Sequence, residues 1–346
     1  MRQILNEQHG WRLLTGAANT ICDVAGVQVG QVSVRENTAC TGVTAILPHG
    51  GNLFERPVVA GMSVLNGFGK SMGLIQLQEL GEIESPILLT NTFGVPACVS
   101  AMTRYAIARN PTIGRSGPTV NSLVLECNDG QVNDIQAFAV SESSALQAVQ
   151  NAEARVMQGT VGAGSGMRTF GYAGGVGTAS RRVHLPGGHA FTVGVLVLSN
   201  FGQQSALRVF GKVMPHIDTG DAEQEAPAEK GSIIVLMATD APLDSRQLTR
   251  LSRRSGAALG RLGSHYGHGS GDISVAFSTA NVVDRGTQDI YPASRLCESR
   301  LDAFFSAAVE STEEAVLNAL WHAEPHVAYD GTVLPSFRRA WQGMLT

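Results

Sequence analysis

The sequence predicts a globular protein of the mixed α and β class, built as one domain around buried strands. Residues 190–200 and 233–238 are apolar runs rich in Val, Leu and Ile and bounded by turn residues, which is typical of strands buried on both faces. Between such runs, apolar residues recur at helical spacing behind capping residues. The 43% apolar content and 40 glycines suit a large core joined by many tight turns.

The first half of the chain alternates strand and helix patterns. Strands end at turn sequences such as Pro48-His-Gly-Gly51 and Asn128-Asp-Gly130. Gly159 follows the last helical pattern of this half, as a C-terminal cap does. Strands are expected within residues 19–30, 41–48, 58–73, 86–91, 121–130 and 190–200, and helices within 74–80, 95–109 and 143–157.

The last third follows the same pattern. Asp244-Ser-Arg-Gln247 is a capping box that begins a helix extending to Leu262. A glycine-rich turn at 267–272 leads into a strand at 273–279. Ser311-Thr-Glu-Glu314 is expected to cap a last helix that runs through Leu320.

Residues 215–230 are acidic, contain Pro227 and lack periodicity, which predicts a solvated linker or flexible loop. They could be taken for a domain boundary. However, the 115 residues that follow Gly231 begin with a buried strand, which needs partners on both faces. A single domain over residues 1–346 is the better interpretation.

Composition and charge exclude several classes of protein. The net charge is −4 with no basic block, so a nucleic-acid partner is not expected. No apolar run reaches membrane-spanning length, which argues against a membrane protein. The N-terminus lacks a secretory pattern, and the five cysteines are scattered without CxxC spacing, so a reducing, cytoplasmic setting without disulfides or zinc is expected.

The common catalytic and cofactor motifs are missing. No HExxH occurs and the nine histidines show no ligand spacing, so neither a metal nor a cofactor is predicted. Gly164-Ser165-Gly166 lacks the strand–turn–helix setting of a nucleophile elbow. The glycine-dense stretch at 159–177 follows a helix and begins none, which disfavours a dinucleotide site. We interpret it as a backbone wall that a substrate approaches closely.

Gly231-Ser232 is an abrupt junction between the acidic segment and a buried strand. A turn before a strand is the commoner explanation for such a pair. The alternative is that the chain is cut here, so that Ser232 becomes an N-terminal nucleophile activated by its own α-amine. An unperturbed α-amino group has a pKa of about 7.7–8.0, so a fraction of it is neutral at pH 7 and can accept a hydroxyl proton. Glu126, a lone carboxylate after apolar residues, is by itself expected to face solvent on a half-exposed strand.

Seven stretches together resemble one family, in the family's order and over nearly the whole chain. The family comprises the self-processing aminopeptidases that include the L-aminopeptidase/D-amidase-esterases and the β-peptidyl aminopeptidases. The stretches are Asp23–Gly30, Leu65–Gly67, Pro86–Thr92, Val161–Met167, Val193–Gly202, Gly231–Val235 with Ala238–Pro242, and Ser270–Asp272 with Ala276–Asn281.

The resemblance implies an α+β fold, a four-layer αββα sandwich shared with ornithine acetyltransferases. It also implies cleavage into residues 1–231 and 232–346, which stay associated, and often a homotetramer. The implied activity is hydrolysis of the amide bond after the N-terminal residue of short peptides or aminoacyl amides, without a metal.

The resemblance assigns roles to four catalytic residues. Ser232 matches the nucleophile. Ser270 matches a serine that hydrogen-bonds it and assists proton transfer, and Asp272 matches the acid that orients this second serine. Asn200 matches the amide that stabilises the oxyanion.

Two more residues match the substrate-binding part of the family's site. Glu126 matches the carboxylate that holds the substrate's free ammonium. Asn128 stands where some members have a tyrosine that assists the oxyanion; an asparagine can still donate a hydrogen bond, but with shorter reach. Two alternatives remain open at this point: an acyltransferase of the same fold, and an uncleaved protein that binds a small ligand.

Overall fold

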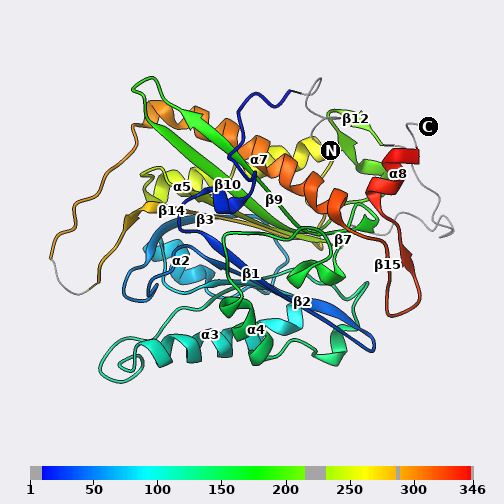
Figure 1. Cartoon of the computed structure of the whole chain (residues 1–346), viewed down its shortest axis with the longest axis horizontal. Coiled ribbons are helices and arrows are strands. Elements are labelled where there is room, and N and C mark those ends of the chain that lie inside the picture. The colour runs from blue at the N-terminus through cyan, green and yellow to red at the C-terminus, as the bar shows by residue number, and fades with distance from the viewer. Residues whose placement is uncertain (1–9, 215–230, 286–288, 344–346) are drawn as a thin grey trace.

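Two β-sheets lie face to face at the centre of the protein, and helices cover both outer faces, giving four layers from top to bottom in Figure 1. The structure is a computed structural model that describes residues 10–214, 231–285 and 289–343. The predicted acidic linker at 215–230 lies outside these residues. The arrangement confirms the expected αββα sandwich.

The larger sheet has six strands and the smaller has four. In spatial order the larger sheet consists of β4 (Glu82–Ile83), β3 (Val58–Gly67), β14 (Gly271–Val282), β13 (Ser232–Thr239), β10 (Ala190–Asn200) and β9 (Gly175–His184). The smaller sheet consists of β1 (Gln28–Glu36), β2 (Ala39–Leu47), β5 (Ile87–Thr90) and β6 (Leu123–Glu126).

Helices on both sides complete the sandwich. The outer face of the larger sheet is covered by α5 (Ser245–Ser252), α6 (Ser255–Leu262) and α7 (Leu301–His322), and that of the smaller sheet by α3 (Val95–Arg109) and α4 (Glu142–Gln150). Among the residues that the structure describes, the shorter helices and strands are α2 (Leu74–Leu80), α8 (Phe337–Gly343), β7 (Arg168–Thr169), β8 (Tyr172–Ala173), β11 (Arg208–Val209), β12 (Lys212–Val213), β15 (His326–Val327) and β16 (Val333–Leu334). The same part of the chain contains 3₁₀ turns at Ile21–Asp23, Thr92–Gly94, Ile135–Ala137, Gly162–Gly166, Gln204–Ala206 and Glu298–Arg300.

Strand β13 explains why the apolar run at 233–238 has no polar interruptions. All eight of its residues are buried. Alternate side chains point to opposite faces of a strand, so Ile233 and Val235 pack among the helices while Ile234 and Leu236 pack against the smaller sheet. Because both faces are covered, the position of this strand is tightly specified.

Several predicted boundaries were wrong because tertiary contacts override local patterns. Helix α4 ends at Gln150 and not near 157, because Glu153 leaves it to pair with Val29 of β1. Gly159 likewise pairs with Val176 of β9 and caps no helix. The strand expected within 19–30 begins only at Gln28, after a 3₁₀ turn.

The two C-terminal helix predictions also needed correction. The helix predicted over 244–262 is divided into α5 and α6, and the hydroxyl of Ser255 donates to the carbonyl of Ser252 at the break (2.7 Å). Helix α7 begins at Leu301, so Ser311-Thr-Glu-Glu314 lies in its middle and caps nothing. Glu314 instead forms a buried ion pair with Arg181 of β9.

Candidate active site

Strand β13 places Ser232 where three strand ends meet in the larger sheet. Ser232 is the first residue of β13, directly opposite Asn200 at the end of β10 and beside Gly271 at the start of β14. The side chain is 4% exposed. Ser232 lies at the end of an inner strand, and the strands on both sides restrict its movement. This suits a nucleophile that must be accurately placed.

The preceding residue must be glycine for steric reasons. A Cβ atom on Gly231 would lie 2.6 Å from the Cα of Phe201 and 2.8 Å from the carbonyl oxygen of Asn200. Both are backbone atoms, so the neighbour cannot turn aside as a flexible side chain could. The Gly-Ser pair therefore allows the chain to pass close to the end of β10.

The hydroxyl of Ser232 lies next to the carbonyl of the residue before it. Its Oγ donates to the Gly231 oxygen at 2.7 Å. The Gly271 amide points at the same place, 3.3 Å from Oγ and 3.2 Å from the Gly231 oxygen. Nucleophile, peptide carbonyl and an N–H donor are thus gathered around one peptide bond.

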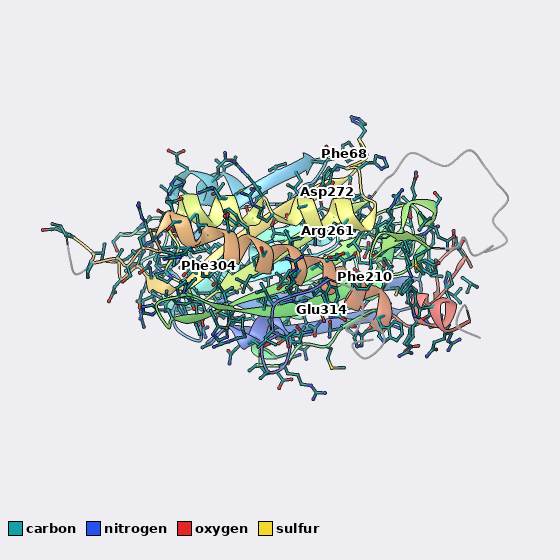
Figure 2. All side chains as sticks on the ribbon, turned by 90° about the horizontal axis from the view of Figure 1, so that it is seen from above. Phe68, Phe210, Arg261, Asp272, Phe304 and Glu314 are labelled. Atoms are coloured by element: carbon teal, nitrogen blue, oxygen red, sulfur yellow. The ribbon has the colours of Figure 1, made fainter. Side chains whose placement is uncertain are left out.

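Ser270 and Asp272 flank Gly271 and bind each other. The hydroxyl of Ser270 donates to Oδ1 of Asp272 at 2.7 Å, and each side chain is 1% exposed. Both predicted residues thus flank the residue that pairs with Ser232 in the β13–β14 ladder. The Ser270 hydroxyl is directed at the Asp272 carboxylate, and its expected hydrogen bond to Ser232 stays a prediction. The backbone N–H of Phe68 donates to the Ser270 carbonyl at 3.2 Å, so the residue after β3 binds this turn; Phe68 and Asp272 are both labelled in Figure 2.

Asn66 supports this turn, a role that was not predicted from the sequence. Its amide donates to the carbonyl of Gly267 at 3.0 Å and to that of Ser270. Asn66 also pairs with Asp272 across the β3–β14 ladder. Its place in Leu65-Asn66-Gly67, one of the stretches that carry the family resemblance, was the available signal.

Asn200 is fixed by hydrogen bonds at both ends of its amide. The backbone N–H of Arg168 donates to Oδ1 at 2.9 Å, and Nδ2 donates to the carbonyl of Asn128 at 2.8 Å. These contacts define which end of the amide carries the donors. Since an amide nitrogen has two N–H groups, Asn200 can bind Asn128 and still donate to a substrate oxygen.

Glu126 is buried, so the expectation from its strand alone, that it faces solvent, was wrong. It is 2% exposed. The loop after β3 covers it, with the Lys70 N–H donating to Oε1 at 2.7 Å, and the hydroxyl of Thr92 donates to Oε2. A carboxylate held by neutral donors and removed from water is well prepared to bind a cation.

Asn128 contributes mainly through its backbone. Its side chain is exposed, and Oδ1 accepts the Gly130 N–H at 2.9 Å within a tight turn. Its carbonyl is the group that binds Asn200. The predicted contact of the Asn128 side chain with substrate remains a prediction.

The buried thiol between these groups is not a competing nucleophile. Burial raises the pKa of Cys127 well above its ordinary value, and the nearby carboxylates of Glu126 and Asp272 raise it further. The thiol therefore stays protonated, whereas attack requires the thiolate.

The glycines at 159–177 allow close packing within the chain, and the expectation that they form a wall for the substrate stays a prediction. A Cβ at Gly166 would lie 2.2 Å from the carbonyl oxygen of Cys40, and one at Gly177 would lie 1.9 Å from that of Ala315. The close approach is therefore between parts of this chain. These glycines let the turn at Gly162–Gly166 lie against β2 and let α7 lie against β9.

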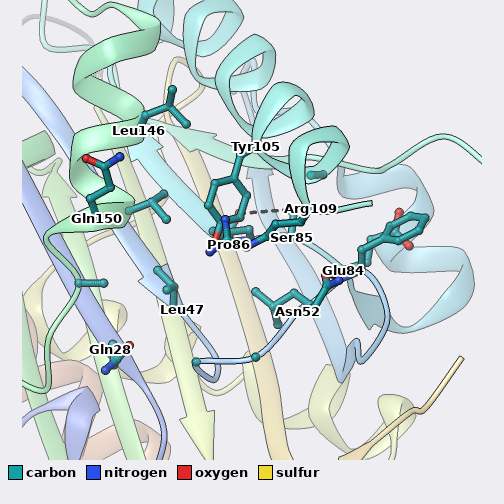
Figure 3. Close-up of a pocket in the computed structure, with 17 residues that line it drawn as sticks. Gln28, Leu47, Asn52, Glu84, Ser85, Pro86, Tyr105, Arg109, Leu146 and Gln150 are labelled. Carbon is teal, nitrogen blue, oxygen red and sulfur yellow. Dashed lines mark hydrogen bonds between the residues drawn. The ribbon is translucent and has the colours of Figure 1, made fainter. Parts of the chain in front are cut away.

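A pocket of about 410 Å³ lies elsewhere, and none of the predicted site residues lines it. Figure 3 shows Tyr105 and Arg109 of α3 on one side of it and Leu146 and Gln150 of α4 on another. Pro86, before the start of β5, also lines the pocket, so the pocket is at the opposite end of that strand from Thr92.

Within residues 10–214, 231–285 and 289–343 no group of three His, Cys, Asp or Glu side chains could hold a metal ion, and no helix is long and apolar enough to cross a bilayer.

Comparison with known proteins gives the family. The model of peptidase family S58 matches residues 19–334. The chain belongs to peptidase family S58. Among curated proteins, this S58 peptidase is 39% identical over 341 residues to the β-peptidyl aminopeptidase BapA of Sphingosinicella microcystinivorans, covering 91% of this chain and 84% of that protein.

Solved structures show the same fold for this S58 peptidase. The PH0078 protein of Pyrococcus horikoshii OT3 has a TM-score of 0.91 at 39% identity, covering 99% of this chain and 97% of that one. The L-aminopeptidase D-Ala-esterase/amidase of Ochrobactrum anthropi, a serine aminopeptidase with a variant of the Ntn hydrolase fold, has a TM-score of 0.87 at 35% identity, covering 97% and 96%. The protein is thus a peptide-bond hydrolase with this fold.

Proposed function

We propose that this peptidase cuts its own chain between Gly231 and Ser232 and then acts as an N-terminal-serine aminopeptidase or amidase. The observation that carries the proposal is the position of the Ser232 hydroxyl, 2.7 Å from the oxygen of the preceding carbonyl and opposite the Asn200 amide. A serine at this place can attack the Gly231 carbonyl first and a substrate carbonyl later.

Self-cleavage converts one peptide bond into two termini. The Ser232 oxygen adds to the Gly231 carbonyl carbon, the bond from that carbon to the Ser232 nitrogen breaks, and an ester remains. Water then hydrolyses the ester, leaving a carboxylate on Gly231 and a free amine on Ser232. The Gly271 N–H, 3.2 Å from the Gly231 oxygen, supports the developing negative charge.

The freed amine prepares Ser232 for the second reaction. In its neutral form it accepts the hydroxyl proton while Oγ attacks the substrate carbonyl. The second N–H of Asn200 stabilises the oxyanion, and Ser270, oriented by Asp272, assists the transfer of the proton to the leaving amine. Water then releases the acyl group from Ser232.

Glu126 explains why the reaction occurs at a free N-terminus. The ammonium of the first residue pairs with this buried carboxylate, which places the first peptide bond at Ser232. A blocked amine cannot form the pair. The substrates are therefore short peptides or aminoacyl amides. One relative is named a β-peptidyl aminopeptidase and another an L-aminopeptidase D-Ala-esterase/amidase. Substrates with an L-, D- or β-residue in the first position are therefore the classes to test.

The family resemblance also supports a homotetramer that works in the cytoplasm, in which the two pieces of each chain stay together. Size-exclusion chromatography with light scattering tests the oligomer. A monomer at micromolar concentration would contradict it.

Analysis of the purified chain tests self-cleavage. We expect pieces of 231 and 115 residues, the second beginning Ser-Ile-Ile-Val. Ser232→Ala should stay intact and inactive on aminoacyl amides. An intact wild-type chain after long incubation, or wild-type turnover by Ser232→Ala, would refute the mechanism. With an added amine acceptor, more transfer product than hydrolysis would identify an acyltransferase instead.

A further inference from the structure

A second buried carboxylate, Asp129, lies three residues beyond Glu126 and has no part in the chemistry above. It is 1% exposed. The Asn133 amide donates to its Oδ1 at 3.0 Å. Burial raises the pKa of Asp129, and hydrogen bonding from the side chains of Thr41, Asn133 and Asn91 lowers it only in part. A carboxylate is rarely buried without a purpose, because its desolvation is costly.

One side of this cluster leads to the predicted ammonium site. Asn91 donates to the Thr41 hydroxyl at 2.8 Å and accepts the Gly94 N–H at 2.6 Å. It thereby caps the 3₁₀ turn Thr92–Gly94. The first residue of that turn, Thr92, donates its hydroxyl to Glu126. A shift of Asn91 would therefore move a donor away from Glu126.

The other side leads to the predicted oxyanion donor. The Asp129 carbonyl accepts the N–H groups of Val132 and Asn133, both at 2.9 Å, which closes the turn after β6. This turn presents the Asn128 carbonyl to Nδ2 of Asn200 at 2.8 Å. Asn133 also fixes the turn to β2, because its Oδ1 accepts the Cys40 N–H at 2.9 Å.

We propose that Asp129 is a positioning residue that holds Glu126 and Asn200 at one fixed separation and so decides which backbone length the enzyme accepts. The inference rests on the proposed function, in which Glu126 binds the substrate ammonium and Asn200 the carbonyl oxygen. An α-aminoacyl and a β-aminoacyl substrate differ by one carbon between these two groups, about 1.5 Å of chain. A rigid frame discriminates between them, and a loosened frame discriminates less.

Asp129→Asn tests this with L-alanine and β-alanine p-nitroanilides as substrates. The substitution keeps the shape but removes the negative charge that hydrogen bonding from Asn133, Thr41 and Asn91 favours. We expect kcat on the better substrate to fall at least tenfold and the ratio of kcat/KM between the two substrates to move at least fivefold toward unity.

Asp134→Asn is the matched control, since Asp134 is in the same loop, is only half-buried and binds Thr38. Its ratio should stay within twofold of the wild type.

The ratio separates positioning from simple loss of folded enzyme. A smaller active fraction lowers both rates equally, so an unchanged ratio in Asp129→Asn would overturn the inference. If that variant does not fold or does not cleave itself, Thr41→Val removes one partner of Asp129 at constant volume and must move the ratio in the same direction. Wild-type enzyme that hydrolyses neither substrate would instead overturn the proposed function.

Discussion

Asn200 and Ser232 face each other directly in the antiparallel pair of β10 and β13. Both residues therefore lie where β10 ends and β13 begins, and the register of these two strands sets the distance between them. A slip of one residue would exchange the two buried faces of β13, which is strongly opposed. The sheet thus fixes the nucleophile and the amide relative to each other without a flexible loop between them.

Gly231→Ala should slow self-cleavage at least tenfold. The new Cβ would lie 2.6 Å from the Cα of Phe201, so residue 231 must shift. That shift disturbs the alignment of its carbonyl group with the Ser232 hydroxyl. The fraction of cleaved chain over time, measured by gel or mass spectrometry, checks this.

Gly260→Ala is the control for that substitution. Gly260 lies in α6, and a Cβ there would meet nothing within 4 Å. This variant should cleave like the wild type and gain up to about 1 kcal/mol of stability, because alanine is the better helix former. Equal cleavage rates in both variants would mean that the close fit at Gly231 is unimportant.

Asn200→Ala should lower kcat by about 10²–10³-fold, the usual effect of removing one oxyanion donor. The cause is loss of charge stabilisation in the transition state, so KM should change much less. Steady-state kinetics on an aminoacyl amide gives both constants. Asn281→Ala, near the far end of β14, should leave them unaltered. A kcat near the wild-type value for Asn200→Ala would remove this residue from the oxyanion site.

Glu126→Gln should raise KM for substrates with a free amine and lower kcat/KM about 30-fold, equivalent to about 2 kcal/mol for a charged hydrogen bond. The glutamine oxygen can still accept the Lys70 N–H, and its N–H₂ group can donate to the Thr92 hydroxyl, but the negative charge is lost. Glu142→Gln, which alters a surface ion pair with Arg104, should have no effect. Unchanged kinetics in Glu126→Gln would place the ammonium elsewhere.

Asp129 should make stability depend on pH in a way that Asp129→Asn does not. Burial raises the pKa of Asp129 from 3.8 to about 7, although its hydrogen-bond partners lower it. Between these values the unfolded chain has released the proton that the folded chain still holds, so stability falls as pH rises from about 4 to about 7. Relative to the wild type, Asp129→Asn should therefore gain stability over this interval.

Urea unfolding of both proteins at several pH values measures this difference. It should grow between pH 4 and pH 7 and then level off. A difference that stays constant with pH would show that the folded protein holds Asp129 at its ordinary pKa.

Local patterns predicted helix 95–109 and strand 190–200 at the observed boundaries, because their apolar spacing agrees with their tertiary surroundings. The prediction of a helix start at Ser311 was wrong, because this capping sequence lies inside α7. Its Glu314 neutralises the buried Arg181. A capping pattern and an ion-pairing pattern use the same residue types. Only the neighbouring strand decides between them.

For the candidate site, the sequence by itself determined the Gly231-Ser232 junction and the buried strand that follows it. It also determined the seven stretches that occur in the same order as in the family. Tertiary structure decided that Glu126 is buried, because the covering residues Lys70 and Thr92 come from distant loops. It also decided that the glycines at 159–177 serve packing. Strand register, finally, placed Asn200 opposite Ser232, since hydrogen bonding between β10 and β13 depends on which faces the remaining layers bury.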